Sequence, residues 1–103
     1  MNPHRLNQSI MEDFKGNIRD FISNVPKGCI FDAHAVIRYL VQKHSDDYLG
    51  FHSGDEPTNS FHSRVSRVIN SFVGENVIER CKEKCYSLNI RDNFSENSCW
   101  KKL

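Results

Sequence analysis

The sequence lacks any long hydrophobic run. No apolar stretch approaches the roughly 20 residues that a membrane-spanning helix needs, and the polar start Met1–Arg5 is not followed by a hydrophobic secretory segment. We therefore expect a cytoplasmic protein without membrane contact. The chain has 103 residues, of which 38% are hydrophobic, and this length predicts a single domain, residues 1–103, with one core.

The sequence also has little net charge. Its 14 Lys and Arg against 13 Asp and Glu give a formal charge of +1, which excludes a strongly basic or acidic surface over the whole molecule. The charge is nevertheless uneven. Residues 1–58 carry six basic and eight acidic side chains, a balance of −2, and residues 59–103 carry eight and five, a balance of +3. Any surface for an acidic partner should therefore lie in the second half.

Cysteine and histidine patterns typical of metal sites are scarce. Structural zinc usually takes two close cysteine pairs, but this chain has one, Cys81 and Cys85, with Cys29 and Cys99 elsewhere. None of the five histidines forms a His-x-x-x-His pair. We expect free thiols, no metal and no cofactor, although four thiols leave zinc open as an alternative. No nucleophile lies in a recognisable catalytic turn, so we also expect no enzymatic activity.

The stretch from Ser60 to Phe72 has no Asp or Glu. Its apolar residues recur at helical steps, which predicts a helix with one buried side; they are Phe61, Val65, Val68, Ile69 and Phe72. The other sides carry His62, Ser63, Arg64, Ser66, Arg67, Asn70 and Ser71. Because a solvated helix face usually mixes both charge signs, this face is typical of one that binds a polyanion, with DNA as the leading candidate.

Two further helices are predicted before this one. Apolar spacing indicates a helix from Ser9 to Val25 that stops at Pro26. A second helix should run from Ala33 to His44 with Asp32 as its N-cap. Between them, Cys29–Phe31 is long enough for a short strand.

The connections around these helices have their own signals. We expect a flexible N-terminus over residues 1–8, and Glu12 and Asp13 in the first turn of the first helix, where the helix dipole favours acids. Residues 45–59 are rich in Ser, Asp, Gly, Pro and Thr and predict a long loop. The third helix should then be capped by Asn59 or Ser60.

The C-terminal third has the pattern of strands. Val77–Ile78 fits either a helix or a strand, and Tyr86–Ile90 alternates as a strand does. Cys99–Leu103 is interpreted as the returning strand of a hairpin, with Trp100 in the core. Residues with turn chemistry lie between these two strands, at 91–93 and 95–97.

The predicted order is helix, short strand, helix, helix and a C-terminal β-hairpin. This order resembles that of a winged helix-turn-helix DNA-binding domain, an α+β fold, over about Ser9 to Leu103. The resemblance implies that the third helix enters the major groove and that the hairpin is the wing. One departure is the connection before the third helix, which is longer than the tight turn of a helix-turn-helix.

The resemblance assigns DNA contacts to the exposed side of the third helix and to the hairpin. Arginine can pair with guanine or hold a phosphate, and small polar side chains can reach base edges or the backbone. The predicted contact residues are Ser63, Arg64, Arg67, Asn70, Ser71, Arg91, Asn93 and Lys101. We expect a regulator of transcription that binds double-stranded DNA, with homodimerisation supplying two half-sites.

The alternative from a different class is an adaptor that binds a protein partner through the same kind of fold. Its anchors would be Tyr48 and Phe51 in the long loop. The outer face of the first helix mixes charges of both signs and has no second apolar stripe, which argues against a broad hydrophobic docking surface there.

Overall fold

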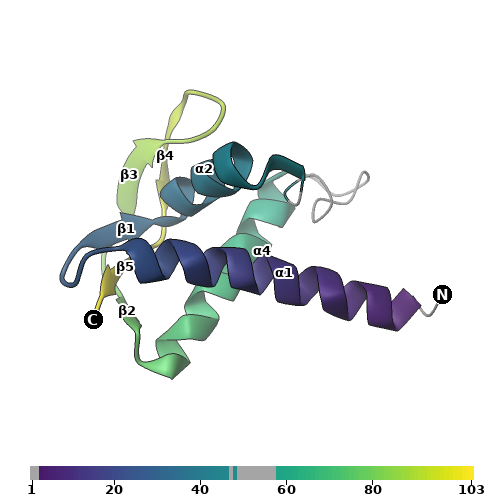
Figure 1. The fold of residues 1–103 in the computed structure, drawn as a ribbon. Coiled ribbons are helices and arrows are strands. Elements are labelled where there is room, and N and C mark those ends of the chain that lie inside the picture. Colours follow the sequence, from purple (N-terminus) through teal and green to yellow (C-terminus); the bar gives the residue numbers. More distant parts are fainter. Residues whose placement is uncertain (1–2, 47, 49–57) are drawn as a thin grey trace.

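The computed structural model describes residues 3–46, 48 and 58–103, with side chains for 12–46, 48 and 60–103. Within these residues the chain is α+β, with three longer helices and five short antiparallel strands (Figure 1). In chain order the elements are α1 (Pro3–Asn24), β1 (Ile30–Asp32), α2 (Ala33–Lys43), α4 (Thr58–Ser71), the 3₁₀ helix η1 (Phe72–Glu75), β2 (Ile78–Arg80), β3 (Cys85–Leu88), β4 (Phe94–Asn97) and β5 (Cys99–Lys102).

The strands form two separate sheets. In the first, β5 lies between β1 and β2, and both pairings are antiparallel. The second is the hairpin β3–β4, which is inserted in the chain between β2 and β5 and projects away from the first sheet (Figure 1). The hairpin is therefore an excursion between two strands that both belong to the first sheet.

The expected pairing of Tyr86–Ile90 with Cys99–Leu103 is wrong. Residues 95–97, predicted as a turn, belong to β4, where Ser95 pairs with Ser87. The reversal comes earlier because Asp92 has a φ of 62°, a left-handed conformation that Asp tolerates. Freed from the hairpin, the last strand pairs with β1 and β2 instead.

The N-terminal helix is longer than expected. α1 begins at Pro3, so the helix includes residues 3–8, which lie before the predicted start at Ser9. Proline is favoured at the first position of a helix, where its missing N–H would have no helical partner. Glu12 and Asp13 consequently lie beyond the first turn and not at the positive end of the dipole.

Of the two predicted helix N-caps, one is confirmed and the other is wrong. Asp32 caps α2 as predicted, because its Oδ1 accepts a hydrogen bond of 2.9 Å from the backbone N–H of Ala35. α4 already begins at Thr58, so Asn59 and Ser60 lie inside the helix and do not cap it. Most of the predicted loop 45–59 lies outside the described residues.

The ambiguity at Val77–Ile78 resolves as a strand. Asn76 has a φ of 60° and ends η1 in the left-handed conformation, which is a common way to stop a helix. The chain then turns into β2, and Ile78 enters the core at 1% exposure.

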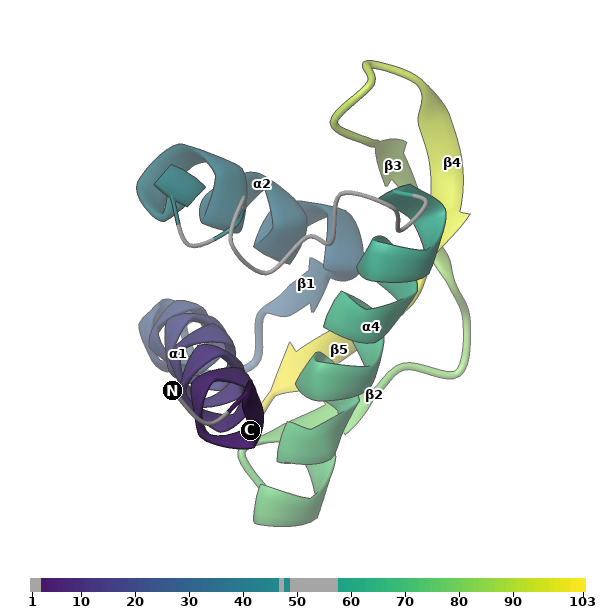
Figure 2. The same cartoon turned by 90° about the vertical axis from the view of Figure 1, so that its right-hand side faces the viewer.

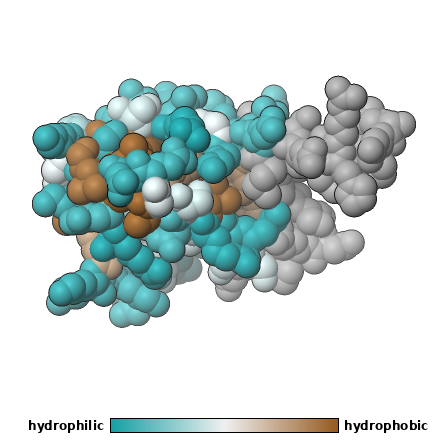
Figure 3. All heavy atoms as spheres, turned by 90° about the horizontal axis from the view of Figure 1, so that it is seen from below, coloured by the Kyte–Doolittle hydropathy of each residue, from teal (hydrophilic) through white to brown (hydrophobic). Residues whose placement is uncertain are grey.

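The core lies between the three helices and one face of the first sheet (Figure 2). Trp100 is at its centre as predicted, 1% exposed, with its ring stacked on Phe31 at 5.8 Å between centroids. On α4, Phe61 packs against Phe14 of α1, and these contacts fix the buried side of α4. The lower face of the molecule shows hydrophobic areas interspersed with hydrophilic ones (Figure 3).

Candidate functional site

The side of α4 opposite the core is the first part of the candidate site. Ser63, Arg67, Asn70 and Ser71 are exposed there, as the helical spacing of the apolar residues predicts. Arg67 has no hydrogen bond or ion pair among the described residues. Its guanidinium group is therefore available to an anionic ligand.

Arg64 is placed differently from Arg67. It is half-buried, and its guanidinium carbon lies 5.3 Å from the centroid of the Phe61 ring, a cation–π contact. The two arginines were predicted to project together from the exposed face, but Arg64 lies at the border of that face, against the core. Arg67 is thus the main positive charge on the exposed side of α4.

Two other predicted contact residues already hold the fold together. Oδ1 of Asn70 accepts a hydrogen bond of 3.1 Å from Nε1 of the buried Trp100. The hydroxyl of Ser71 donates to the backbone oxygen of Val68 at 2.6 Å. Asn70 keeps its amide N–H groups for a further partner, whereas the donor of Ser71 is used inside the helix.

Arg80 joins this surface, although no pattern in the sequence predicts it there. Arg80 and Arg67 both line a small depression of about 160 Å³, and Nη2 of Arg80 donates to the hydroxyl of Ser98 at 3.1 Å. The depression brings Arg67 of α4 and Arg80 of β2 together, with Ser66, Asn70, Ser98 and Trp100 as its other lining residues. The signal was weak because Arg80 ends a three-residue strand.

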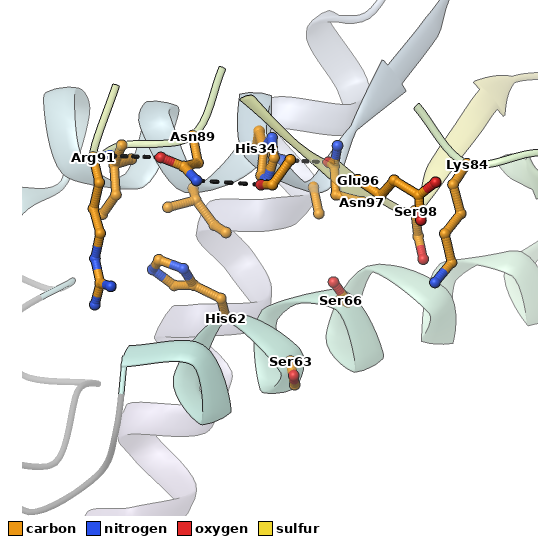
Figure 4. Close-up of a pocket in the computed structure, with 14 residues that line it drawn as sticks. His34, His62, Ser63, Ser66, Lys84, Asn89, Arg91, Glu96, Asn97 and Ser98 are labelled. Carbon is orange, nitrogen blue, oxygen red and sulfur yellow. Dashed lines mark hydrogen bonds between the residues drawn. The ribbon is translucent and has the colours of Figure 1, made fainter. Parts of the chain in front are cut away.

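A larger cleft of about 360 Å³ separates α4 from the hairpin. Figure 4 shows His62, Ser63 and Ser66 of α4 on one side and hairpin residues on the other. Lys84 and Arg91 lie toward opposite ends of this cleft (Figure 4), and Glu96 also lines it. The cleft is therefore polar with a mixed charge, and cations exceed the acid.

The hairpin is anchored to the start of α2 by a directional chain of hydrogen bonds. The hydroxyl of Ser87 donates to Oδ2 of Asp32 at 2.7 Å and lies 2.8 Å from Nδ1 of His34. With the Ser87 proton committed to Asp32, Nδ1 of His34 is the donor, and its Nε2 lies 3.4 Å from the hydroxyl oxygen of Ser95. The backbone N–H of His34 also donates to Oδ1 of Asn97 at 2.9 Å.

These Ser, His and Asp side chains do not have the order of a catalytic triad. In a triad the carboxylate orients the histidine, and the histidine takes the serine proton. Here the carboxylate of Asp32 accepts directly from Ser87, and the Ser95 to His34 contact is long. The arrangement holds the hairpin in place and thereby positions the cleft.

The tip of the hairpin presents two predicted contact residues. Oδ1 of Asn89 accepts hydrogen bonds from the backbone N–H groups of Arg91 and Asn93, at 2.9 and 3.2 Å. The side chains of Arg91 and Asn93 are exposed. Burial raises the pKa of Tyr48, and the charge of Arg91 opposes this rise.

Lys101 lies apart from the rest of the predicted set. It pairs with Ile30 and Glu79 in the first sheet, and its neighbour Trp100 faces the core. Because successive side chains in a strand point to opposite faces, Lys101 lies on the face of the sheet away from α4. The structure therefore does not bring Lys101 and Arg67 together.

The four cysteines are free thiols. Within the described residues, no group of three or more His, Cys, Asp or Glu side chains is arranged to hold a metal ion. Among the same residues, no helix is both long and apolar enough to cross a membrane. No family model, curated protein or solved structure matches this chain.

Proposed function

We propose that this protein binds double-stranded DNA as a winged-helix regulator of transcription, with α4 in the major groove and the β3–β4 hairpin as the wing. The strand arrangement supports this proposal: β5 lies between β1 and β2, and the hairpin is inserted where a wing would leave the sheet. The proposal assigns the protein no catalytic role.

The observation that carries the proposal is the exposed side of α4 with Arg67 next to Arg80. This surface offers two guanidinium groups beside hydroxyl and amide groups, and the helix contributes no carboxylate to it. Guanidinium groups bind phosphate oxygens and guanine edges in a bidentate manner. We assign Arg67 and Ser63 to the groove and Arg80 to the phosphate backbone, with Asn70 contributing its amide donors.

The hairpin would add contacts outside the groove. Arg91 and Asn93 are exposed at its tip, and Lys84 lies at its base on the cleft side. Asp92 and Glu96 reduce the positive potential, so we expect the hairpin to position the duplex more than to supply affinity. Lys101 has no part in the proposed contact, because it lies on the other face of the sheet.

A fluorescence anisotropy titration of labelled duplex DNA tests the proposal. We expect saturable binding by the full chain, loss of affinity with Arg67→Ala, and unchanged affinity with Lys27→Ala, which removes an exposed charge in the turn before β1. Circular dichroism of each variant controls for folding. Absence of binding at low salt, or equal effects of the two substitutions, would refute the proposal.

We further propose that two copies bind as a homodimer, which the stoichiometry of the titration tests.

A protein-binding adaptor is the second candidate, and a different surface favours it. Tyr86 and Phe94 are 68% and 62% exposed on the outer face of the hairpin, with their rings stacked at 5.9 Å. Exposed aromatic pairs are frequent anchors of interfaces. The anchors first expected are less suitable: Tyr48 is half-buried and bonded to His62 at 3.2 Å, and Phe51 lies outside the described residues.

The two candidates make opposite predictions for one pair of variants. Replacement of Tyr86 and Phe94 by Ser should abolish recovery of a protein partner if the adaptor is correct and should leave DNA affinity unchanged. If the chain binds DNA, Arg67→Ala should weaken DNA affinity and should leave recovery of a protein partner unchanged.

A further inference from the structure

Three of the four cysteines gather where the hairpin leaves the first sheet. Cys81 follows β2, Cys85 begins β3, and Cys99 begins β5. The two chain segments that connect the sheet to the hairpin, residues 81–84 and Ser98, therefore both run past these thiols. Cys29 is exposed, lies just before β1 and is outside this group.

Cys81 and Cys99 directly face each other across antiparallel strands. The register of β2 and β5 pairs Arg80 with Trp100, and the next backbone bond continues it, because the N–H of Cys81 donates to the oxygen of Cys99 at 2.9 Å. Directly opposed residues in such a hydrogen-bonded pair have Cα atoms about 5.5 Å apart, which is within the range that a disulfide bridges. Opposed side chains also lie on the same face of the sheet.

The thiol of Cys99 is held beneath the segment that joins Cys81 to Cys85. Its Sγ–H donates to the backbone oxygen of Glu83 at 3.2 Å, and the residue is only 4% exposed. Cys81 and Cys85 are half-buried. Cys81 is therefore more accessible to an oxidant in solvent than Cys99, which is buried.

We propose that Cys81 and Cys99 form a reversible disulfide when the protein meets hydrogen peroxide, and that this bond is a redox modification site at the root of the hairpin. The inference goes beyond the proposed function and does not depend on it, because its test measures sulfur chemistry.

The reaction takes place in two steps. The thiolate of Cys81 attacks one oxygen of the peroxide, the O–O bond breaks, and a sulfenic acid and hydroxide result. The sulfur of Cys99 then attacks the sulfenic sulfur, the S–S bond forms, and the hydroxyl group leaves as water with the thiol proton of Cys99. The two sulfurs together lose two electrons, and the peroxide is reduced to two waters once the hydroxide takes up the proton that the Cys81 thiol released.

The environment of Cys99 makes it the resolving thiol. Burial, followed by the neighbouring thiols of Cys85 and Cys81, raises its pKa to about 12, so Cys99 is protonated at neutral pH and is a poor first target for peroxide. The second step should therefore accelerate as the pH rises toward that pKa. The thiol of Cys85 also lies near Cys99, but the strand partner of Cys85 is Asn97, in the second sheet.

Trypsin separates all four cysteines, which makes the test direct. The reduced full chain is treated with hydrogen peroxide, remaining thiols are blocked, and the digest is analysed by mass spectrometry. The peptides are Gly28–Arg38, Cys81–Lys82, Cys85–Arg91 and Asp92–Lys101. We expect Cys81–Lys82 joined to Asp92–Lys101, a loss of two hydrogens from the intact mass, and full reversal by dithiothreitol.

Matched variants decide the assignment. Cys29→Ser and Cys85→Ser should still form the bond, and Cys81→Ser should not. In Cys99→Ser, dimedone should trap a sulfenic acid on Cys81; circular dichroism verifies the fold of each variant. A bond from Cys99 to Cys85, a bond between Cys81 and Cys85 alone, oxidation confined to Cys29, or thiols that stay reduced would each overturn the proposal.

Discussion

The indole Nε1 of Trp100 donates a hydrogen bond of 3.1 Å to the side-chain oxygen of Asn70. This bond joins the central strand of the first sheet to the exposed side of α4, and it thereby connects the core to the proposed DNA surface. It fixes the rotation of the helix, because Asn70 can reach Trp100 only when the exposed side of α4 has its present orientation. Asn70 therefore contributes both to the stability of the fold and to the proposed DNA surface.

Asn70→Ala should destabilise the fold. The substitution leaves the buried indole N–H without its acceptor, at a cost of about 1–3 kcal/mol in the free energy of unfolding. Urea denaturation measures this loss. In a Trp100→Phe background the same substitution should cost much less, because no indole N–H remains to be satisfied; equal costs in the two backgrounds would contradict the assigned role.

Asp32→Ala should also destabilise the protein, by more than the loss of a cap alone. Asp32 caps α2 and accepts the Ser87 hydroxyl, so we expect the usual cap cost of about 1 kcal/mol plus the loss of the Ser87 bond. Thermal unfolding measures the effect. The exposed Lys27→Ala serves as the control, with a change within about 0.5 kcal/mol. Equal melting temperatures for the two variants would be inconsistent with the proposed anchor of the hairpin.

Part of this arrangement could be predicted from the sequence and part could not. The buried sides of the helices, the Asp32 cap and the burial of Trp100 follow from local spacing and chemistry, and all were predicted correctly. The pairing of β4 with β3 could not be predicted, because in strands of four residues the alternation of apolar and polar side chains is too short to select a partner strand. Arg80 was missed for the same reason: its position beside Arg67 depends on strand register.

Stability should fall as the pH rises from about 9 toward 12. Burial and then the nearby thiols raise the pKa of Cys99 from 9.0 to about 12, so the unfolded chain releases this proton first and the native state loses its advantage as the pH approaches the native pKa. The stabilisation from the buried, protonated thiol is fully present below pH 9. Urea midpoints under reducing conditions test this, and Cys99→Ala should show a smaller decline; parallel curves would count against it.

Arg64→Ala and Arg67→Ala should separate packing from recognition. Arg64 lies against the ring of Phe61, so its loss should reduce stability by about 0.5–1 kcal/mol and affect DNA affinity less. Arg67 is exposed, so its loss should leave the melting temperature unchanged and weaken DNA binding by roughly 1–3 kcal/mol if it reads a base. Anisotropy and thermal melts of the same preparations measure both effects. If Arg64→Ala weakened DNA affinity more than Arg67→Ala, Arg64 would be the residue that contacts DNA.

The most direct test of DNA binding by the exposed side of α4 is the salt dependence of duplex affinity, measured for the wild type and for the Arg67→Ala, Arg80→Ala double variant. With Arg80 on a phosphate and Arg67 in the groove, the slope of log affinity against log salt should become shallower by about 0.9, together with a loss of affinity at every salt concentration. If Arg67 also neutralises a phosphate, the slope should change by about 1.8, roughly 0.9 for each lost contact. Binding with the same slope and strength in both proteins would contradict the account.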